Sequence, residues 1–207
     1  MTNPHQESPT AVIFDIGGVL VDWDPRHLYR SLFDRESEME HFLSEICTPD
    51  WHNSLDAGTP MDVAIAALST RYPEYAPLIA AYRDRWHHMF KGAISGTVSL
   101  LARLDDRGIP LFALSNFPGE KFGEFRHSFP FTARFRDVVV SSEEGLIKPD
   151  PRIYELALDR FGLTAATTLF IDDRLDNVES AQKVGIRAHH FQNPNDLEKR
   201  LLDEGLL

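Results

Sequence analysis

Six polar residues suited to catalysis each stand at or just after the end of a short apolar run. Asp172 and Asp173 are adjacent, and two neighbouring carboxylates that close an apolar run repel each other unless a cation is present. A carboxylate, a hydroxyl and a lysine in the same setting are the groups needed to handle a phosphorylated or halogenated substrate. Each residue alone also fits an ordinary loop, but the set together indicates one catalytic site. The residues are Asp15, Ser115, Asn116, Lys148, Asp172 and Asp173.

Buried parallel strands are the elements expected to position these side chains. A continuous apolar run that ends in a glycine turn, as residues 11–14 do before Gly17 and Gly18, is typical of a strand buried on both faces. Helical patterns separate the runs, including one at 151–161 with Asp150 as its N-cap. Alternating strands and helices predict an α/β domain with a parallel sheet. We expect strands at 11–14, 110–116, 137–142, 168–173 and 187–192, and a further helix at 96–107.

One long stretch breaks this alternation. Residues 25–90 are helical in pattern throughout, with one helix ending at Gly58 and the next beginning at Thr59 and Pro60. We predict a helical insertion over 25–90 and a core formed by 1–24 and 91–207, with residues 1–10 as a loose leader. Such an insertion lies over the C-terminal edge of the sheet, where open α/β folds bind ligands. It is therefore a candidate lid.

Composition limits the classes of partner. The chain has 207 residues, and its formal net charge of -11 with scattered Lys and Arg argues against nucleic acid. No window approaches the length of a membrane span, and no basic region precedes an apolar stretch at the N-terminus. The single cysteine, Cys47, excludes an intrachain disulfide and fits a small apolar residue in a helix. We expect a cytoplasmic protein that does not bind membranes, as a monomer or small homo-oligomer.

Four separated motifs carry a resemblance to a known superfamily. They are residues 14–20 (FDIGGVL), 114–116 (LSN), 148–151 (KPDP) and 170–173 (FIDD), the last followed by Asp176 and Asn177. In order and spacing they resemble the haloacid dehalogenase-like superfamily, and among its members the small sugar-phosphate phosphatases and the N-terminal phosphatase domain of soluble epoxide hydrolases. The resemblance implies a Rossmann-like parallel sheet flanked by helices, with an inserted all-helical cap.

The resemblance also implies roles at the predicted site. Asp15 would attack phosphorus and form an aspartyl-phosphate that water later hydrolyses. Mg²⁺, which prefers oxygen ligands, would be held by Asp15, the backbone carbonyl of Gly17 and Asp172, while Asp173 would support the bound metal without contacting it directly or would pair with Lys148.

Phosphate binding is implied for the remaining motif residues. Ser115 and backbone N–H groups near Asn116, together with the Gly17-Gly18 turn, would hold phosphoryl oxygens, and Lys148 would neutralise the developing charge. Asp22 would hydrogen-bond the turn that opens and closes the cap. The implied substrate is a small phosphorylated metabolite such as a sugar phosphate.

Gly17 is the departure from the superfamily's phosphatases, most of which carry a second aspartate there that protonates the leaving alcohol. Loss of a general acid typically costs about 10²–10⁴ in rate. Three interpretations follow: a substrate with a better leaving group, a substitute acid, or a slow or inactive protein. A mutase, which must pass a proton between two hydroxyls, is disfavoured. The candidate substitutes are Asp22, Asp24, His52, His87 and His88.

Two alternatives to a phosphatase remain open from the sequence. A 2-haloacid dehalogenase-type hydrolase uses the same nucleophile without metal, and halide needs no proton to leave, so Gly17 is compatible with it. The acidic pair Asp172-Asp173 favours a metal and hence phosphate. The second alternative is a catalytically weak binding module of the same fold, against which the intact set of Asp15, Ser115 and Lys148 argues.

Overall fold

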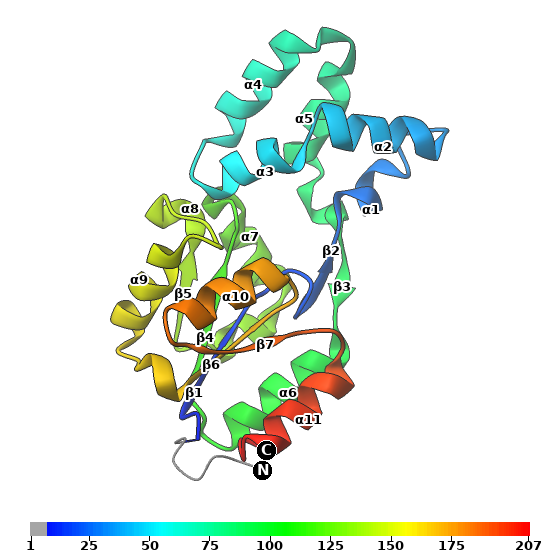
Figure 1. Cartoon of the computed structure of the whole chain (residues 1–207). Coiled ribbons are helices and arrows are strands. Elements are labelled where there is room, and N and C mark those ends of the chain that lie inside the picture. Colours follow the sequence, from blue (N-terminus) through cyan, green and yellow to red (C-terminus); the bar gives the residue numbers. More distant parts are fainter. Residues whose placement is uncertain (1–7) are drawn as a thin grey trace.

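A five-stranded parallel sheet forms the centre of the core. The computed structural model describes residues 8–207, and the strands follow the order β5-β4-β1-β6-β7. Strand β1 lies between β4 and β6, with Phe14 opposite both Ala113 and Ile171. All four pairings are parallel, so the carboxyl ends of the strands lie at one edge (Figure 1). The strands are β1 (Ala11–Phe14), β4 (Leu111–Ser115), β5 (Asp137–Val140), β6 (Thr168–Asp172) and β7 (Arg187–His190).

Helices cover both faces of this sheet, and the alternation of strand side chains explains why. Val12 and Phe14 of β1 pack in one cluster with residues of α6, α7 and α11, whereas Ala11 and Ile13 pack in another with α9 and α10. Every residue of β1, β4 and β6 is buried as a result. The helices of the core are α6 (Ser95–Asp106), α7 (Gly119–Ser128), α8 (Ser141–Glu144), α9 (Pro151–Phe161), α10 (Leu175–Lys183) and α11 (Pro194–Asp203), with 3-10 helices η3 (Pro130–Arg134) and η4 (Ala165–Thr167).

The α/β fold class and all five strands expected from the sequence are confirmed. The strands at 11–14, 110–116, 137–142, 168–173 and 187–192 agree with the structure to within one or two residues at each end. Helix α9 begins at Pro151, and the side chain of Asp150 accepts a hydrogen bond from the N–H of Arg152, as an N-cap does.

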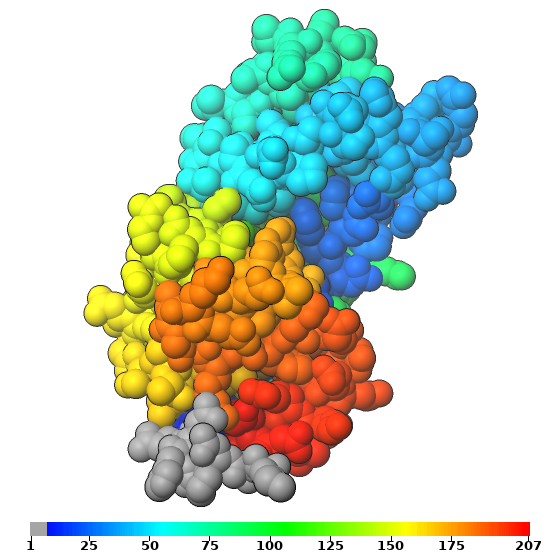
Figure 2. Space-filling model, viewed as in Figure 1, coloured from blue at the N-terminus to red at the C-terminus, as the bar shows by residue number. Residues whose placement is uncertain are grey.

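Above the carboxyl edge of the sheet lies a helical segment, Pro25–Met89, for which we keep the name cap (Figures 1 and 2). Gly58, with φ of 104°, follows α3, and Met61 opens the next helix. Cys47 is buried just after α2, and burial raises the pKa of its thiol. The cap contains α1 (Pro25–Tyr29), α2 (Glu36–Glu45), α3 (Pro49–Asp56), α4 (Met61–Arg71) and α5 (Ala76–Asp84), with 3-10 helices η1 (Pro73–Tyr75) and η2 (Trp86–Met89).

A two-stranded antiparallel ribbon connects the cap to the core. Strand β2 (Val21–Trp23) leads into the cap and β3 (Phe90–Ala93) leads out of it, with a register irregularity between Asp22 and Trp23. The expectation of no strand up to Phe90 is therefore wrong at its last residue, and the two connections are paired strands. Their three to four residues, with Gly92 in β3, are too few to show a period-2 pattern.

None of the helices within residues 8–207 is long and apolar enough to cross a membrane. Most of the leader expected at residues 1–10 lies outside the described part of the chain.

Candidate active site

Asp15 stands at the carboxyl end of β1, where a tight loop begins. Its Oδ1 accepts a hydrogen bond of 2.7 Å from the N–H of Ile16, and the N–H groups of Leu20 and Val21 both donate to the carbonyl of Ile16. Gly18 turns this loop with φ of 72°, in the left-handed region that favours glycine. A Cβ atom there would lie 2.3 Å from Oδ2 of Asp173, so the loop packs directly against that side chain.

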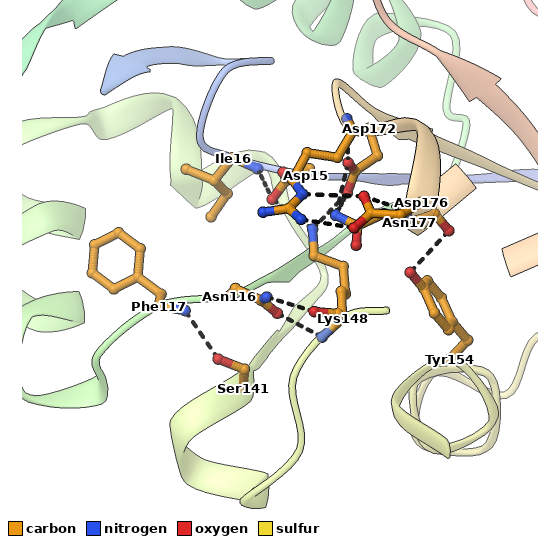
Figure 3. Close-up of polar contacts among 11 residues, drawn as sticks. Asp15, Ile16, Asn116, Phe117, Ser141, Lys148, Tyr154, Asp172, Asp176 and Asn177 are labelled. Carbon is orange, nitrogen blue, oxygen red and sulfur yellow. Dashed lines mark hydrogen bonds and ion pairs between the residues drawn. The ribbon is translucent and has the colours of Figure 1, made fainter. Parts of the chain in front are cut away.

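Lys148 lies between two of the predicted carboxylates. Its Nζ is 2.9 Å from Oδ1 of Asp15 and 2.7 Å from Oδ2 of Asp172, and the side chain is almost fully buried (Figure 3). Asn116 fixes the backbone of this lysine from both sides: its Nδ2 donates to the carbonyl of Lys148, and its Oδ1 accepts from the N–H of Lys148. The side chain of Asn116 therefore positions the ammonium group, which leaves any substrate contact at residue 116 to its backbone.

Asp172 accepts hydrogen bonds on both carboxylate oxygens. Besides Lys148, it accepts from the N–H of Arg174 and from Nδ2 of Asn177, at 2.9 Å to Oδ1 and 3.1 Å to Oδ2. The supporting role of Asn177 was not predicted, although its place in the first turn of the helix after β6 gives the spacing that brings its amide back to the strand end.

Three carboxylates and one ammonium group share this small volume. One ligand oxygen each from Asp15, Asp172 and Asp173 lies within 4.8 Å of the others. The pKa of Asp15 is raised to about 7, mainly by burial; Lys148 acts in the opposite direction, and the charges of Asp172 and Asp173 contribute to the rise. Burial works against the charge of Lys148, yet its two carboxylate partners leave its pKa raised. The cluster thus carries unbalanced negative charge, with oxygen donors of the kind that Mg²⁺ prefers.

A cavity of about 280 Å³ opens above the cluster, between the strand ends and the cap. Its polar end is lined by Asp15, Gly17, Gly18, Ser115, Asn116, Lys148 and Asp173. Its other side is largely aromatic and is contributed by the ribbon, the cap and the loop after β4, through Trp23, Trp86, Phe90 and Phe117, with His52, Asn53 and Asp56 beside them.

The predicted site residues converge on this cavity. Asp15, Gly17, Gly18, Ser115, Asn116, Lys148 and Asp173 line it directly, and Asp172 lies behind them, fully buried against Lys148. Within the described residues, the lining includes His52 but not Asp22, Asp24, His87 or His88.

Asp22 and Asp24 are engaged elsewhere. Oδ1 of Asp22 lies 2.9 Å from Nε2 of His27, and Oδ1 of Asp24 accepts from the N–H of Arg26 as the N-cap of α1. Both contacts fix the start of the cap where it leaves the ribbon.

The cap is docked on the core beside the cavity. Ser141, at the start of α8, donates from its Oγ to the backbone carbonyl of Asp56 at 2.6 Å and accepts from the N–H of Phe117 at 3.0 Å. A second contact follows five residues later, where the N–H of Met61 donates to Oε1 of Glu120 in α7. The C-terminal end of α3 is thereby held over the strand ends.

Comparison with known proteins agrees with this arrangement. The family model for haloacid dehalogenase-like hydrolases matches residues 9–185. The chain therefore belongs to the haloacid dehalogenase-like hydrolase family and is a hydrolase.

Relatives and a solved structure extend over most of the chain. A sesquiterpene phosphatase of Aspergillus oryzae is 29% identical, covering 87% of this chain and 89% of the relative. An N-acetylmuramic acid 6-phosphate phosphatase of Pseudomonas aeruginosa is 26% identical, covering 86% and 79%. The fold is shared with a family enzyme of Bacteroides thetaiotaomicron solved with magnesium and inorganic phosphate, at a TM-score of 0.67, 19% identity, and coverage of 89% and 95%.

Proposed function

We propose that this hydrolase is a magnesium-dependent phosphatase that acts on a small phosphorylated metabolite through an aspartyl-phosphate at Asp15. The observation that carries the proposal is the placement of Asp15 at the cavity floor, 2.9 Å from the buried ammonium of Lys148 and beside two further carboxylates. The relatives named as phosphatases support the same chemistry.

The chain's own residues account for the attack on phosphorus. Asp15 is held by the N–H of Ile16 through Oδ1, which leaves Oδ2 as the attacking atom. Lys148 offsets the negative charge that otherwise repels a carboxylate from a phosphate monoester. Ser115, buried at the end of β4, and the backbone after it face the same cavity and would hold phosphoryl oxygens. The phosphoryl group would thus bind in the cavity beside both Asp15 and Lys148.

The residues present fit a bound Mg²⁺. Asp15, Asp172 and Asp173 offer carboxylate oxygens as hard ligands, and their unbalanced negative charge favours cation binding. The ion would neutralise charge on the phosphoryl oxygens. The carbonyl of Gly17, in the loop after β1, is the proposed backbone ligand.

The two adjacent aspartates, Asp172 and Asp173, differ in their surroundings. Both oxygens of Asp172 already accept hydrogen bonds from Lys148, Arg174 and Asn177, whereas Asp173 lies on the cavity wall. We therefore propose Asp173 for the direct metal contact and Asp172 for orienting Lys148, in place of the opposite division expected from the sequence.

The aromatic side of the cavity would contact the organic part of the substrate. Trp23 and Trp86 lie with their ring centroids 6.0 Å apart, and Phe90 and Phe117 continue the wall. Such a surface fits the C–H face of a sugar or a hydrocarbon chain. The substrate class is accordingly a monophosphate whose organic part presents an apolar face.

The test is release of inorganic phosphate from a panel of monophosphates, with and without Mg²⁺, beside halide release from 2-chloropropionate. The panel contains sugar 1-phosphates, sugar 6-phosphates, prenyl phosphates, nucleotides and acetyl phosphate. Magnesium-dependent phosphate release supports the proposal. Metal-independent halide release would support the dehalogenase alternative instead. Release of neither phosphate nor halide from any substrate would support the binding module.

A further inference from the structure

Gly17 leaves the leaving-group oxygen of the proposed phosphatase without the usual proton donor. Among the substitutes named from the sequence, only His52 lines the cavity. Burial lowers the pKa of His52 to about 4, so its imidazole ring is uncharged at neutral pH and cannot act as the general acid. The donor must therefore be sought among the other groups of the cavity wall.

Asp56 is a carboxyl of the cap that belongs to none of the sequence motifs. It is the last residue of α3, it lines the cavity, and only 3% of its surface is exposed. Its Oδ1 is buried and has no hydrogen-bond partner among the described residues. A buried carboxyl oxygen without a partner is costly unless a ligand or a proton satisfies it.

The burial of Asp56 favours the protonated acid. Its pKa is raised to about 8, mainly by burial; the charge of Lys148 opposes this shift, and the charge of Asp15 adds to it by a smaller amount. On the cap side, Oδ2 lies 3.3 Å from Nε2 of His52, whose Nδ1 lies 2.9 Å from the hydroxyl of Tyr82.

The contacts on the cap side are compatible with a protonated Asp56. Burial raises the pKa of Tyr82 well above its usual value, so its hydroxyl keeps its proton and can donate to Nδ1 of His52. The ring proton of His52 then sits on Nε2 and faces Oδ2 of Asp56. His52 thus faces the carboxyl of Asp56 through Oδ2, while Oδ1 has no hydrogen-bond partner among the described residues.

The position of Asp56 is fixed by the docking of the cap. Its backbone carbonyl accepts the 2.6 Å hydrogen bond from Ser141, whose hydroxyl also holds the N–H of Phe117 in the cavity wall. The next turn passes Gly58 so close to the core that a Cβ atom there would lie 2.9 Å from the carbonyl of Ser142. Asp56 is thus held at the site by the docking of the cap on the core.

Resting on the proposed phosphatase activity, we propose that Asp56 is the catalytic acid that replaces the aspartate missing at position 17. As Asp15 forms its bond to phosphorus, the bond from phosphorus to the leaving oxygen breaks, and that oxygen keeps the electron pair and takes the proton from the carboxyl group of Asp56. In the second step water attacks phosphorus, gives a proton to the Asp56 carboxylate, and the bond between Asp15 and phosphorus breaks. Inorganic phosphate leaves and both side chains return to their starting states.

The test is the rate of leaving-group release in single turnovers with enzyme in excess, using p-nitrophenyl, phenyl and alkyl phosphates. Asp56→Asn keeps the shape of the side chain and removes the acid. We expect alkyl phosphate release to slow by about 10²-fold or more, and p-nitrophenyl release to change little, because nitrophenolate leaves without a proton. Asp50→Asn, on an exposed position of the same helix, is the matched control and should resemble the wild type.

The proposal would be overturned if Asp56→Asn slowed release of all three leaving groups equally while melting as cooperatively as the wild type. Asp56 would then be a binding or structural residue. Asp56→Glu keeps a carboxylic acid but displaces it by one methylene group. This variant replaces Asp56→Asn in the test if the Asn variant folds poorly. It should slow alkyl release alone, and equal slowing would again overturn the proposal. Failure of the phosphatase assignment is separate, since the wild type would then release no leaving group at all.

Discussion

The Nζ atom of Lys148 lies 2.9 Å from Oδ1 of Asp15, so the buried ammonium group contacts the carboxylate that we propose as the nucleophile. Burial raises the pKa of Asp15 to about 7, and without the charge of Lys148 the pKa would be higher still. The contact therefore keeps a carboxylate available near neutral pH at a site where desolvation favours the acid.

Asp15→Asn is expected to reduce phosphate release by about 10³-fold or more, because an amide cannot form the phosphoryl ester. Its melting temperature in EDTA should equal or exceed that of the wild type, since Lys148 retains Asp172 and one repulsive carboxylate is gone. Steady-state assays and thermal melts check both points. Asp159→Asn, on an exposed site of α9, is the control. Normal turnover in Asp15→Asn would remove the nucleophile assignment.

Asp173→Asn and Asp172→Asn separate metal binding from the positioning of Lys148. With Asp173 as the direct ligand, its variant should lose most of the Mg²⁺-induced rise in melting temperature, because a ligand stabilises only through its affinity for the folded state. Asp172→Asn should keep more of that rise while turnover falls. Mg²⁺ titrations followed by thermal shift decide between them, and the reverse order would restore the division of roles expected from the sequence.

Gly18→Ala tests the close approach of the nucleophile loop to Asp173. At φ of 72° an alanine is strained, and its Cβ would overlap the Asp173 carboxylate. We expect a loss of about 1–3 kcal/mol in the free energy of unfolding. Gly17→Ala is the matched comparison, since a Cβ there meets nothing within 4 Å, and it should cost less. Equal losses in chemical denaturation would contradict the account of this loop.

Gly17→Asp restores the acid that the family's phosphatases carry. The space around a Cβ at position 17 is open, so the side chain can be accommodated. If Asp56 already serves as the acid, the substitution should change alkyl phosphate turnover little in the wild type and raise it in the Asp56→Asn background. A large gain in the wild type alone would mean that the natural enzyme works without an acid.

The pH dependence of stability gives an independent view of Asp56. Burial raises its pKa from an ordinary value of 3.8 to about 8 in the folded protein, so the folded state holds the proton more tightly and loses stability as pH rises between these values. The neighbouring titrating groups are His52, Tyr82, Lys148 and Asp15. Asp56→Asn should therefore match the wild type near pH 4 and exceed it near pH 8, by a few kcal/mol at most. Parallel unfolding curves across this range would contradict the burial of an ionisable acid.

The sequence was sufficient to predict the sheet and the convergence at its edge. Apolar runs such as residues 11–14 are long enough to fix a buried strand, and polar residues at their carboxyl ends must meet when the strands are parallel. Asp15, Lys148 and Asp172 were therefore predictable as neighbours, although not the distances between them.

Two features of the site depend on tertiary contacts that cannot be predicted from local sequence patterns. Asp56 reads as a surface residue before a glycine turn, and only the docking of α3 on Ser141 places it in the cavity. The division of work between Asp172 and Asp173 likewise depends on Asn177, whose amide reaches back from the first turn of α10 to Asp172. Adjacent residues of the same type cannot be told apart before that contact is known.

The most direct test of the central proposal is mass spectrometry of the wild-type protein quenched in acid during turnover of the best substrate from the panel. The account predicts a mass increase of one phosphoryl group that peptide mapping places on Asp15, that requires Mg²⁺ and that is absent from Asp15→Asn. Turnover without any covalent phosphoryl group, or an adduct that persists in Asp15→Asn, would contradict it.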